Sequence, residues 1–254
     1  MKNRNDVLIF VSHYVNEEIL NRFRYISEGF ASYGDAFLVI NSDYLHSNIL
    51  ESSISRIIFV SNTMINNLGI RKISNELIPG SNHLILLWFY LTHPNYYNYW
   101  NVEYDVVFNG DWSFFFKKVK TIQADFLSSH IQYYKDNPSW YWWNYYYSPV
   151  LHVDLESKIR SFNPIYRISN SALNIILTSL QNGSFGHHEV FIPTILFYRG
   201  FKIKDFGGRG SFVDHKLKEG LYFCNEFLNT MRFRPVFFNL SDLYIPNVLY
   251  HPLK

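Results

Sequence analysis

The chain has 254 residues, and 48% of them are hydrophobic, so it is long enough to bury the core of one large domain. Its formal net charge of +2 excludes a strong general attraction to nucleic acid, although the pI near 8.4 permits weak attraction to an anionic membrane face. The single cysteine, Cys224, excludes an internal disulfide and any metal site built from cysteines.

Neither a secretory leader nor a membrane span is expected. The apolar stretch before His13 is too short for a signal peptide, and the longest apolar run, 84–91, is far shorter than the roughly 20 residues that cross a bilayer. The single cysteine also fits a reducing compartment. We therefore expect a soluble, cytoplasmic protein, with peripheral contact at the inner face of the cell membrane as an open alternative.

The first part of the chain predicts a parallel sheet. Continuous apolar runs at 7–12 and 36–40 are typical of strands buried on both faces, and the apolar spacing over 16–33 predicts a helix between them. A strand, a helix and a strand of this length form a βαβ unit. The runs 57–60 and 84–90 indicate further strands. The segment 99–108 then reaches the carboxyl edge of the sheet, where open α/β sheets bind ligands.

The second part mixes helices and short strands. We expect a helix around 114–118, a short strand at 124–127 and a loop at 140–147. A helix over 171–180 would start at Ser169 or Asn170 as its N-cap. A short helix or turn near 187–190, a last strand at 199–203 and a mobile glycine-rich loop at 206–211 complete the chain. Without a repeat or linker, residues 1–254 are expected to form one domain.

Two carboxylates, Glu103 and Asp105, stand at the end of an aromatic, apolar run. Because successive strand side chains point to opposite faces, such a pair converges on one ion only where the strand stops and bends. Hard oxygen ligands suit Mg²⁺ or Mn²⁺, which meet one or two carboxylates plus substrate phosphates. His251 is a candidate third ligand. The alternative is that the two acids only cap a turn or pair with a lysine.

An aromatic segment offers a second candidate feature. Seven of the eight residues from 140 to 147 are aromatic, including Trp142 and Trp143. Sugar C–H faces stack on aromatic rings, so the segment predicts either a platform for an acceptor sugar or a packed lid.

Two charged side chains lie near expected helix starts. Arg167 precedes the helix at 171–180, where backbone N–H groups favour anions, so it would hold a diphosphate or an anionic acceptor, or else pair locally. Glu189 follows two histidines and is a candidate general base. Its alternative role is that of a carboxylate stabilised at a helix N-terminus. The spacing is not that of a zinc protease.

Together these segments resemble a GT-A-type glycosyltransferase. Glu103-Tyr104-Asp105 resembles the Asp-x-Asp metal motif of that fold, with Glu in first place. His188-Glu189 before 190–193 resembles the late acidic motif that supplies the catalytic base in inverting members. More closely, residues 99–106, 110–112 and 251–254 look like an uncharacterised family of transferases from bacterial polysaccharide clusters.

The resemblance implies an α/β fold, GT-A-like, with a mostly parallel central sheet flanked by helices. Residues 1–112 would form a Rossmann-like nucleotide-binding half and 113–254 the acceptor-binding half. The implied activity moves a sugar from a nucleotide-diphosphate donor, with UDP as the expected nucleotide. The acceptor would be a hydroxyl group of a growing O-antigen or capsule-type glycan, free or lipid-linked. Transfer would invert the anomeric centre, with Glu189 as the base.

The resemblance also assigns roles to individual residues. Glu103, Asp105 and His251 would hold Mn²⁺ or Mg²⁺. The base and ribose would contact Ser12, His13, Asn41 and Asp43. The leaving group would contact Arg167 or Arg209. The acceptor sugar would contact Trp142, Trp143 and Asp111.

Two other functions stay open at this point. A non-catalytic carbohydrate-binding or assembly subunit would use the aromatic segment alone. A sugar nucleotidyltransferase would also use an acidic pair, but no glycine-rich loop carrying Arg or Lys follows the first strand. The glycines at 206–211 lack the spacing of a phosphate-binding loop.

Overall fold

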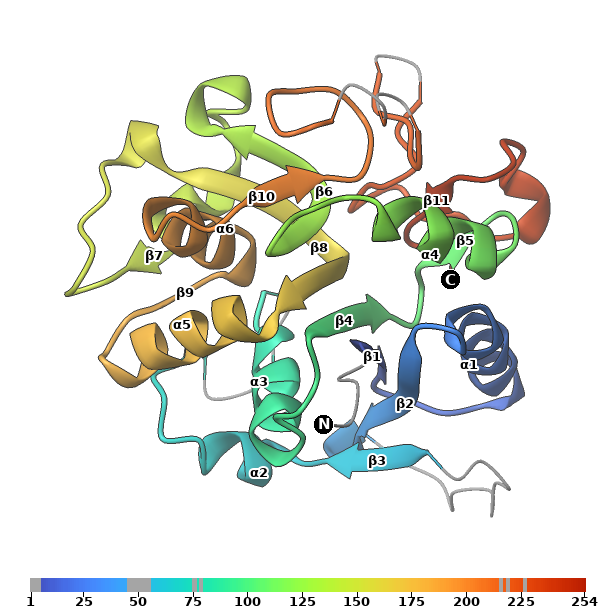
Figure 1. The fold of residues 1–254 in the computed structure, drawn as a ribbon, viewed down its shortest axis with the longest axis horizontal. Coiled ribbons are helices and arrows are strands. Elements are labelled where there is room, and N and C mark those ends of the chain that lie inside the picture. The colour runs from blue at the N-terminus through green and yellow to red at the C-terminus, as the bar shows by residue number, and fades with distance from the viewer. Residues whose placement is uncertain are drawn as a thin grey trace.

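The computed structural model describes residues 6–44, 56–74, 77, 80–214, 217, 220–225 and 228–254. Seven strands form the central sheet in the order β10-β6-β8-β4-β1-β2-β3 (Figure 1). Their bounds are β1 Asp6–Ser12, β2 Gly34–Asn41, β3 Ile57–Val60, β4 Asn98–Glu103, β6 Phe126–Tyr133, β8 Ile159–Ser169 and β10 Ile203–Asp205.

The sheet is mostly parallel. Strand β1 pairs in parallel with β2 and β4, β2 with β3, and β10 with β6. Only β8 runs the other way, because it is antiparallel to both β4 and β6. The predicted class, α/β with a mostly parallel sheet flanked by helices, is therefore confirmed.

Helices cover both faces of the sheet, as the alternation along β1 requires. Val7 and Ile9 belong to one buried cluster with α3, α5 and α6, whereas Leu8 and Phe10 belong to another with α1 and α4. The helix bounds are α1 Glu17–Phe30, α2 Asn62–Asn66, α3 His83–Thr92, α4 Trp112–Lys120, α5 Asn170–Gln181 and α6 His188–Tyr198. Within the described residues, no helix has both the length and the apolar character needed to cross a bilayer.

Local capping explains several helix starts. The Asn16 side chain accepts a hydrogen bond from the Ile19 N–H at the start of α1, and Ser169 accepts from the Ala172 N–H at the start of α5. The choice of Ser169 or Asn170 as the α5 cap thus resolves to Ser169. Side-chain capping satisfies N–H groups that have no partner within the helix.

One predicted strand is wrong. The run 84–90 is not a strand but most of helix α3, and seven of the ten residues of that helix are buried. A helix that is apolar all round is a buried helix, and a continuous apolar run does not distinguish it from a buried strand. The last strand also starts later than expected, at Ile203, and β6 extends beyond 127 to Tyr133.

Two short ribbons lie beside the main sheet. Strand β5 (Val107–Phe108) pairs antiparallel with β11 (Leu249–Tyr250), and β7 (Tyr146–Tyr147) pairs with β9 (Phe185–Gly186). The expected aromatic loop at 140–147 thus contains a 3₁₀ turn, Tyr141–Asn144, and one of these strands. The β5–β11 ribbon brings the last described residues next to the end of β4.

Candidate metal and acid–base site

The first part of the site is built where β4 stops. After Glu103 the backbone turns, with the Tyr104 N–H donating to the Val11 carbonyl and the Val106 N–H donating to the Glu103 carbonyl, both at 3.0 Å. This bend allows Glu103 and Asp105, which would face opposite ways on a straight strand, to point into one space. The β5–β11 ribbon then places His251 opposite them.

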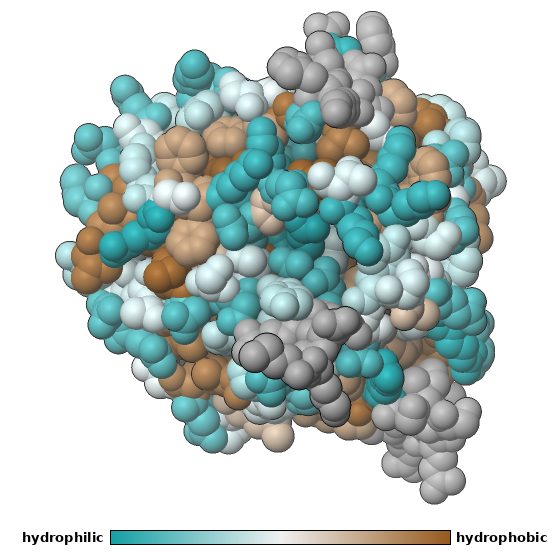
Figure 2. Space-filling view, in the orientation of Figure 1, coloured by the Kyte–Doolittle hydropathy of each residue, from teal (hydrophilic) through white to brown (hydrophobic). Residues whose placement is uncertain are grey.

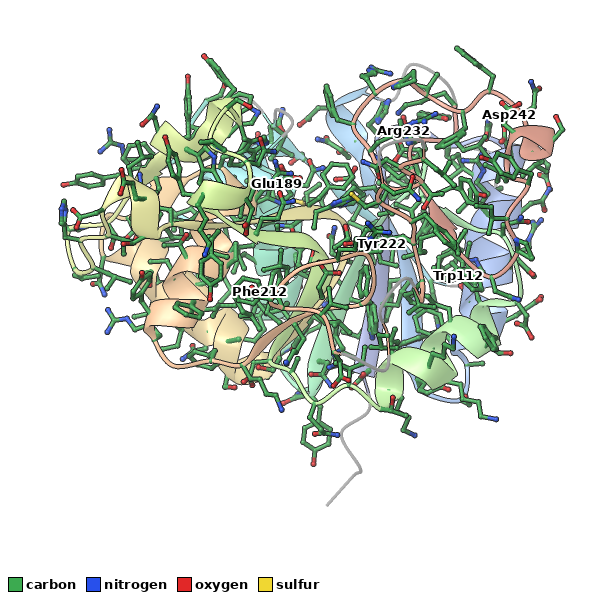
Figure 3. All side chains as sticks on the ribbon, turned by 90° about the horizontal axis from the view of Figure 1, so that it is seen from above. Trp112, Glu189, Phe212, Tyr222, Arg232 and Asp242 are labelled. Carbon is green, nitrogen blue, oxygen red and sulfur yellow. The ribbon has the colours of Figure 1, made fainter. Side chains whose placement is uncertain are left out.

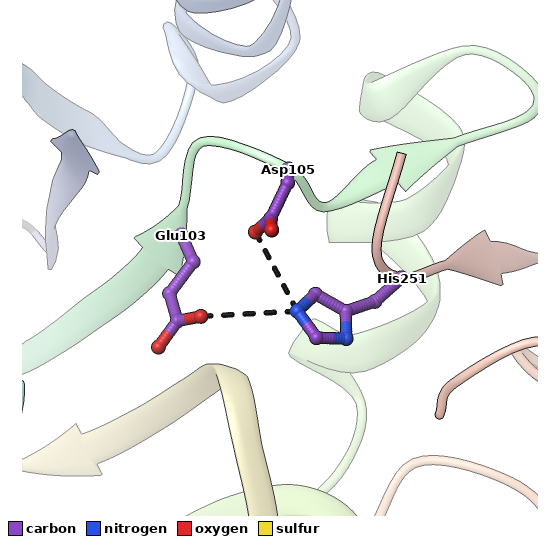
Figure 4. Close-up of side chains that lie close together, drawn as sticks. All are labelled: Glu103, Asp105 and His251. Atoms are coloured by element: carbon purple, nitrogen blue, oxygen red, sulfur yellow. Dashed lines mark ion pairs between the residues drawn. The ribbon is translucent and has the colours of Figure 1, made fainter. Parts of the chain in front are cut away.

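The three side chains converge (Figure 4). His251 Nε2 lies 3.5 Å from Asp105 Oδ1 and 3.8 Å from Glu103 Oε2. His251 Nδ1 lies 2.8 Å from the Arg232 carbonyl oxygen, which can only accept, so Nδ1 carries the hydrogen. An imidazole whose other nitrogen is held in this way is typical of metal-binding histidines.

The donor set fits a divalent cation. One atom from each of the three residues lies within 4.8 Å of the others. Asp105 Oδ1 is buried and, apart from the 3.5 Å approach of His251 Nε2, has no hydrogen-bond partner among the described residues. A buried carboxylate oxygen without a partner is costly, and a cation at this point would satisfy it. Two carboxylates and one imidazole are compatible with Mn²⁺ and Mg²⁺.

The two carboxylates of this cluster differ in their acidity. Burial and the nearby charge of Asp105 raise the pKa of Glu103 to about 7. Burial also acts to raise the pKa of Asp105, but His251 and Lys254 outweigh it and lower that pKa to about 2. Asp105 is therefore the permanent anion of the site.

Lys254 stands at the mouth of the cluster, and its ion pair with Asp105 is the pairing with a lysine that the sequence left open as an alternative, without assigning which lysine. Its Nζ lies 2.5 Å from Asp105 Oδ2 and 2.6 Å from the Tyr104 hydroxyl. The side chain is 39% exposed, so the ammonium group reaches solvent while it neutralises Asp105. Its placement follows from the β5–β11 pairing, which a local sequence pattern does not reveal.

Glu189 forms the second part of the site. It lies in the first turn of α6, where its N–H donates to His187 Nδ1 at 3.3 Å. Its Oε1 accepts from the Asn163 N–H at 3.2 Å. Burial raises the pKa of Glu189 to about 7, although Arg160 and the Asn163 hydrogen bond act to lower it. The short helix or turn expected near 187–190 is the start of a helix of 11 residues, whose first turn holds Glu189 as the alternative role of that carboxylate required.

The two parts are electrostatically one site. The charge of Glu189 contributes to the raised pKa of Glu103, and the charge of His251 acts on Glu189. Asn82, which precedes α3, holds Glu103 in place, since its Nδ2 donates to Glu103 Oε1 at 2.6 Å. Neither Asn82 nor Arg160 was expected from the sequence, because both depend on which elements meet in space.

The aromatic segment borders Glu189 through His187. The Trp142 ring stacks on the His187 ring, with centroids 4.6 Å apart and planes 24° apart. Trp142 keeps part of its surface exposed. Trp143 is only 1% exposed and its indole N–H donates to the Asn137 carbonyl, so its faces are taken up by packing. Of the two predicted platform residues, the structure leaves Trp142 open to a ligand.

The residues expected at base and ribose lie at the carboxyl ends of β1 and β2. The His13 ring packs edge-on against Tyr104, with centroids 5.1 Å apart, and is therefore next to the metal cluster. Ser12 is buried and donates to the Tyr14 carbonyl. Asn41 accepts from the Asp43 N–H, and Asp43 accepts from the Asn62 N–H. The parallel pairing of β1 and β2 places these two strand ends side by side.

Arg167 lies toward the end of the sheet that is opposite to the metal cluster. Because β8 runs antiparallel, Arg167 is beside Trp100, and its Nη2 donates to the Ile122 and Ala124 carbonyls at 3.0 Å. The expectation that Arg167 reaches the diphosphate assumed that the N-terminus of α5 faces the site. It does not, so the structure does not bring Arg167 to the metal cluster. The alternative was that Arg167 pairs locally, as these hydrogen bonds show.

Two other predicted residues have local roles. Asp111 is exposed and caps α4 by accepting from the Ser113 N–H and hydroxyl. Arg209 follows β10 and is exposed, and its charge acts on Cys224.

Comparison with known proteins gives no family assignment. No family model and no curated protein matches the chain. Among solved structures it is similar to 4-diphosphocytidyl-2C-methyl-D-erythritol synthase from Anaerococcus prevotii, with a TM-score of 0.46 and 9% identity over 80% of this chain and 88% of that one.

Two further solved structures resemble the chain more weakly. A protein described as a glucose-1-phosphate thymidylyltransferase from Bacillus anthracis has a TM-score of 0.41 and 10% identity over 79% of this chain and 86% of that one. A glycosyltransferase that acts on the major capsid of PBCV-1 has a TM-score of 0.30 and 8% identity over 68% and 66%. Likenesses at these TM-scores carry no weight for function, which has to be judged from the site itself.

Proposed function

We propose that this chain is a metal-dependent glycosyltransferase. It would move a sugar from a nucleotide-diphosphate donor to a hydroxyl group of a growing cell-surface glycan. The observation that carries the proposal is the pairing of two carboxylate environments in one site: a cation-binding cluster around Asp105, and a buried Glu189 whose pKa is raised to about 7. The mostly parallel sheet flanked by helices is also the architecture that the resemblance to GT-A-type enzymes implies.

The cluster of Glu103, Asp105 and His251 would hold Mn²⁺ or Mg²⁺. A bound divalent cation offsets the negative charge of a departing nucleoside diphosphate. In this proposal Lys254, rather than Arg167 or Arg209, is the cationic side chain nearest the leaving group. Its partly exposed side chain brings the ammonium group to the Asp105 carboxylate, which would also hold the metal ion. Arg167 lies toward the opposite end of the sheet.

Glu189 acts as the general base. The acceptor oxygen attacks the anomeric carbon, the bond from that carbon to the diphosphate oxygen breaks, and the acceptor proton passes to Glu189. A single displacement of this kind inverts the anomeric centre. The Asn163 N–H and His187 hold the Glu189 carboxylate and its backbone in place. The exposed part of Trp142 would stack on the acceptor sugar.

The nucleoside would lie over the ends of β1 and β2. Ser12, His13, Asn41 and Asp43 are found there, and ligands of open α/β sheets bind beyond the carboxyl ends of the strands. UDP is the first nucleotide to test, as the resemblance implies.

The deciding experiment measures donor hydrolysis. Purified protein is incubated with a panel of nucleotide sugars in Mn²⁺ or in EDTA, and free nucleotide is followed. We expect slow, metal-dependent release from one donor, and thermal stabilisation by the matching nucleotide diphosphate only when Mn²⁺ is present.

Asp105→Asn tests the metal cluster directly. Turnover should be abolished and the Mn²⁺-dependent stabilisation lost, because the permanent anion of the cluster is removed. Asp154→Asn, at an exposed carboxylate, is the matched control and should behave as wild type. If Asp105→Asn kept its activity, or if UDP, GDP and CMP all failed to stabilise the wild type, the transferase proposal would give way to a carbohydrate-binding subunit.

A further inference from the structure

The segment between Met231 and Asn247 exposes an unusual amount of apolar surface. Four side chains that we call the apolar rim are 67% to 71% exposed: Phe233, Phe238, Leu240 and Tyr244. They are four of the five most exposed large apolar side chains among the described residues. Scattered single apolar residues are normal on a surface, but a concentration on one short segment marks a contact surface.

The fold does not need the apolar rim for its own packing. Phe237 and Leu243 anchor the same segment in a small core with Val248, Tyr250 and Leu253. Phe237 meets Tyr250 edge-on, with ring centroids 5.2 Å apart. Each anchor is followed directly by an exposed rim residue, so the segment is fixed from beneath and presents Phe238 and Tyr244 outward.

Along the segment 231–247 the basic side chains outnumber the acidic ones. Arg232 and Arg234 flank Phe233, and Arg234 lies over the Phe233 ring, 5.5 Å from its centroid. The only acid after residue 227 is Asp242, whose carboxylate already accepts from the Phe238 and Asn239 N–H groups. Figure 3 shows Arg232 and Asp242 along the same margin of the molecule. Arginine pairs well with phosphate groups, and aromatic side chains favour the level of lipid headgroups.

The rim is directly connected to the candidate site. The Arg232 carbonyl holds His251 Nδ1, and Met231 forms a backbone bridge with His251. On the other side, the Asn109 side chain donates to the Ile245 carbonyl at 2.9 Å, which ties the segment to the chain that follows Asp105. A surface that contacts the rim would therefore lie close to the metal cluster.

We propose that the apolar rim docks on a bilayer that contains anionic phospholipid. Phe233, Phe238, Leu240 and Tyr244 insert at the headgroup level, while Arg232 and Arg234 contact lipid phosphates. This placement would bring the site to acceptors carried on lipids, a consequence that rests on the proposed function, whereas docking itself does not.

Vesicle co-sedimentation tests the docking without any donor or acceptor. We expect the full chain to sediment with vesicles of phosphatidylglycerol and phosphatidylcholine, and much less with phosphatidylcholine alone. The double variant Phe238→Ser/Leu240→Ser should bind at least about tenfold more weakly, because two inserting side chains are lost. Arg234→Gln should weaken binding to the anionic vesicles and reduce its salt dependence.

Controls separate docking from folding and from catalysis. Tyr97→Ser changes an exposed aromatic residue that directly precedes β4 and lies outside the rim segment, so this variant should bind vesicles as wild type does. The rim variant should keep the wild-type melting temperature, since both of its positions are about 71% exposed. Equal vesicle binding by rim variant and wild type would overturn the proposal. So would absence of binding to any vesicle, or rim-dependent dimerisation in solution, which would indicate a second copy as the occupant.

A failed vesicle test would leave the metal-dependent donor hydrolysis untouched. Conversely, an inactive protein that still bound anionic vesicles would count against the transferase alone. The two proposals therefore fail separately.

Discussion

At the scale of single residues, the site separates carboxylates by their environment. Asp105 has a pKa lowered to about 2 by its cationic neighbours, while burial raises that of Glu189 to about 7. Groups of one chemical type with pKa values held apart commonly divide the work of a site between a fixed charge and a proton acceptor. Replacing Asp105 should therefore affect metal binding, whereas replacing Glu189 should affect proton transfer.

Glu189→Gln should lower kcat by about 10²- to 10⁴-fold with little change in donor KM, because the base is lost while donor contacts remain. The base is active when ionised, so the wild-type rate should rise as pH increases through about 7 and level off above it. At saturating Mn²⁺, which keeps the Glu103 carboxylate ionised although its pKa is also raised to about 7, the variant should lack this rise. Steady-state kinetics from pH 5.5 to 9 measures both effects, with Glu156→Gln at an exposed carboxylate as the control. A normal pH profile in Glu189→Gln would assign the base elsewhere.

Lys254→Met should change metal and nucleotide affinity in opposite directions. Removing the ammonium group 2.5 Å from Asp105 Oδ2 removes a competitor for the cation, so Mn²⁺ should bind more tightly. The nucleotide diphosphate should bind about tenfold more weakly, because a charge-assisted hydrogen bond is lost. Calorimetric titration with each ligand is the measurement, and Lys202→Met, on the exposed approach to β10, is the control. Parallel losses of both affinities would indicate a structural role for Lys254.

At the scale of elements, local patterns predicted most strands and helices because their signals are local. The apolar runs of β1, β2 and β3 and the capping residue of α5 are all contained within a few positions of the chain. Helix α3 was mistaken for a strand because burial on all sides removes the periodicity that distinguishes the two. Strand β8 was not predicted at all, so neither its antiparallel direction nor the distance of Arg167 from the site could be read from the sequence.

The cap of α1 offers a test of one element. Asn16→Ala removes the acceptor of the Ile19 N–H and should lower the free energy of unfolding by about 1 kcal/mol. Asn16→Ser keeps an acceptor and should stay near wild type, which makes it the matched control. Urea denaturation followed by far-ultraviolet circular dichroism measures the difference. A loss shared by both variants would show that the Asn16 side chain has another role.

At the scale of the whole molecule, the site depends on contacts between distant segments. The Glu-x-Asp pair was recognisable because both ligands are neighbours in sequence. The approach of His251 depends instead on β11 pairing with β5, and that of Asn82 depends on where α3 packs. On the face seen in Figure 2, apolar and polar side chains are interspersed over the surface. Such long-range arrangement has no single-segment signature.

Metal binding should therefore stabilise the β5–β11 ribbon against opening. Mn²⁺ at 100 times its dissociation constant should slow amide hydrogen exchange around 249–253 by up to about 100-fold, because opening the ribbon must release the ion. Exchange in α5, on the far side of the sheet from α1, should stay unchanged. Hydrogen exchange followed by mass spectrometry distinguishes the two regions. Unchanged exchange at 249–253 would mean that His251 is not a ligand.

Arg22 links the two ends of this arrangement. From helix α1, its Nη1 donates to the Tyr104 carbonyl at 3.1 Å and to the Leu253 carbonyl at 3.3 Å, two acceptors separated by most of the chain. A chain in which only β1 and β4 have folded has neither His251 nor the second acceptor of Arg22 in place. Affinity for the cation would thus arise only when the β5–β11 ribbon has formed, so partly folded chains would not capture metal or donor.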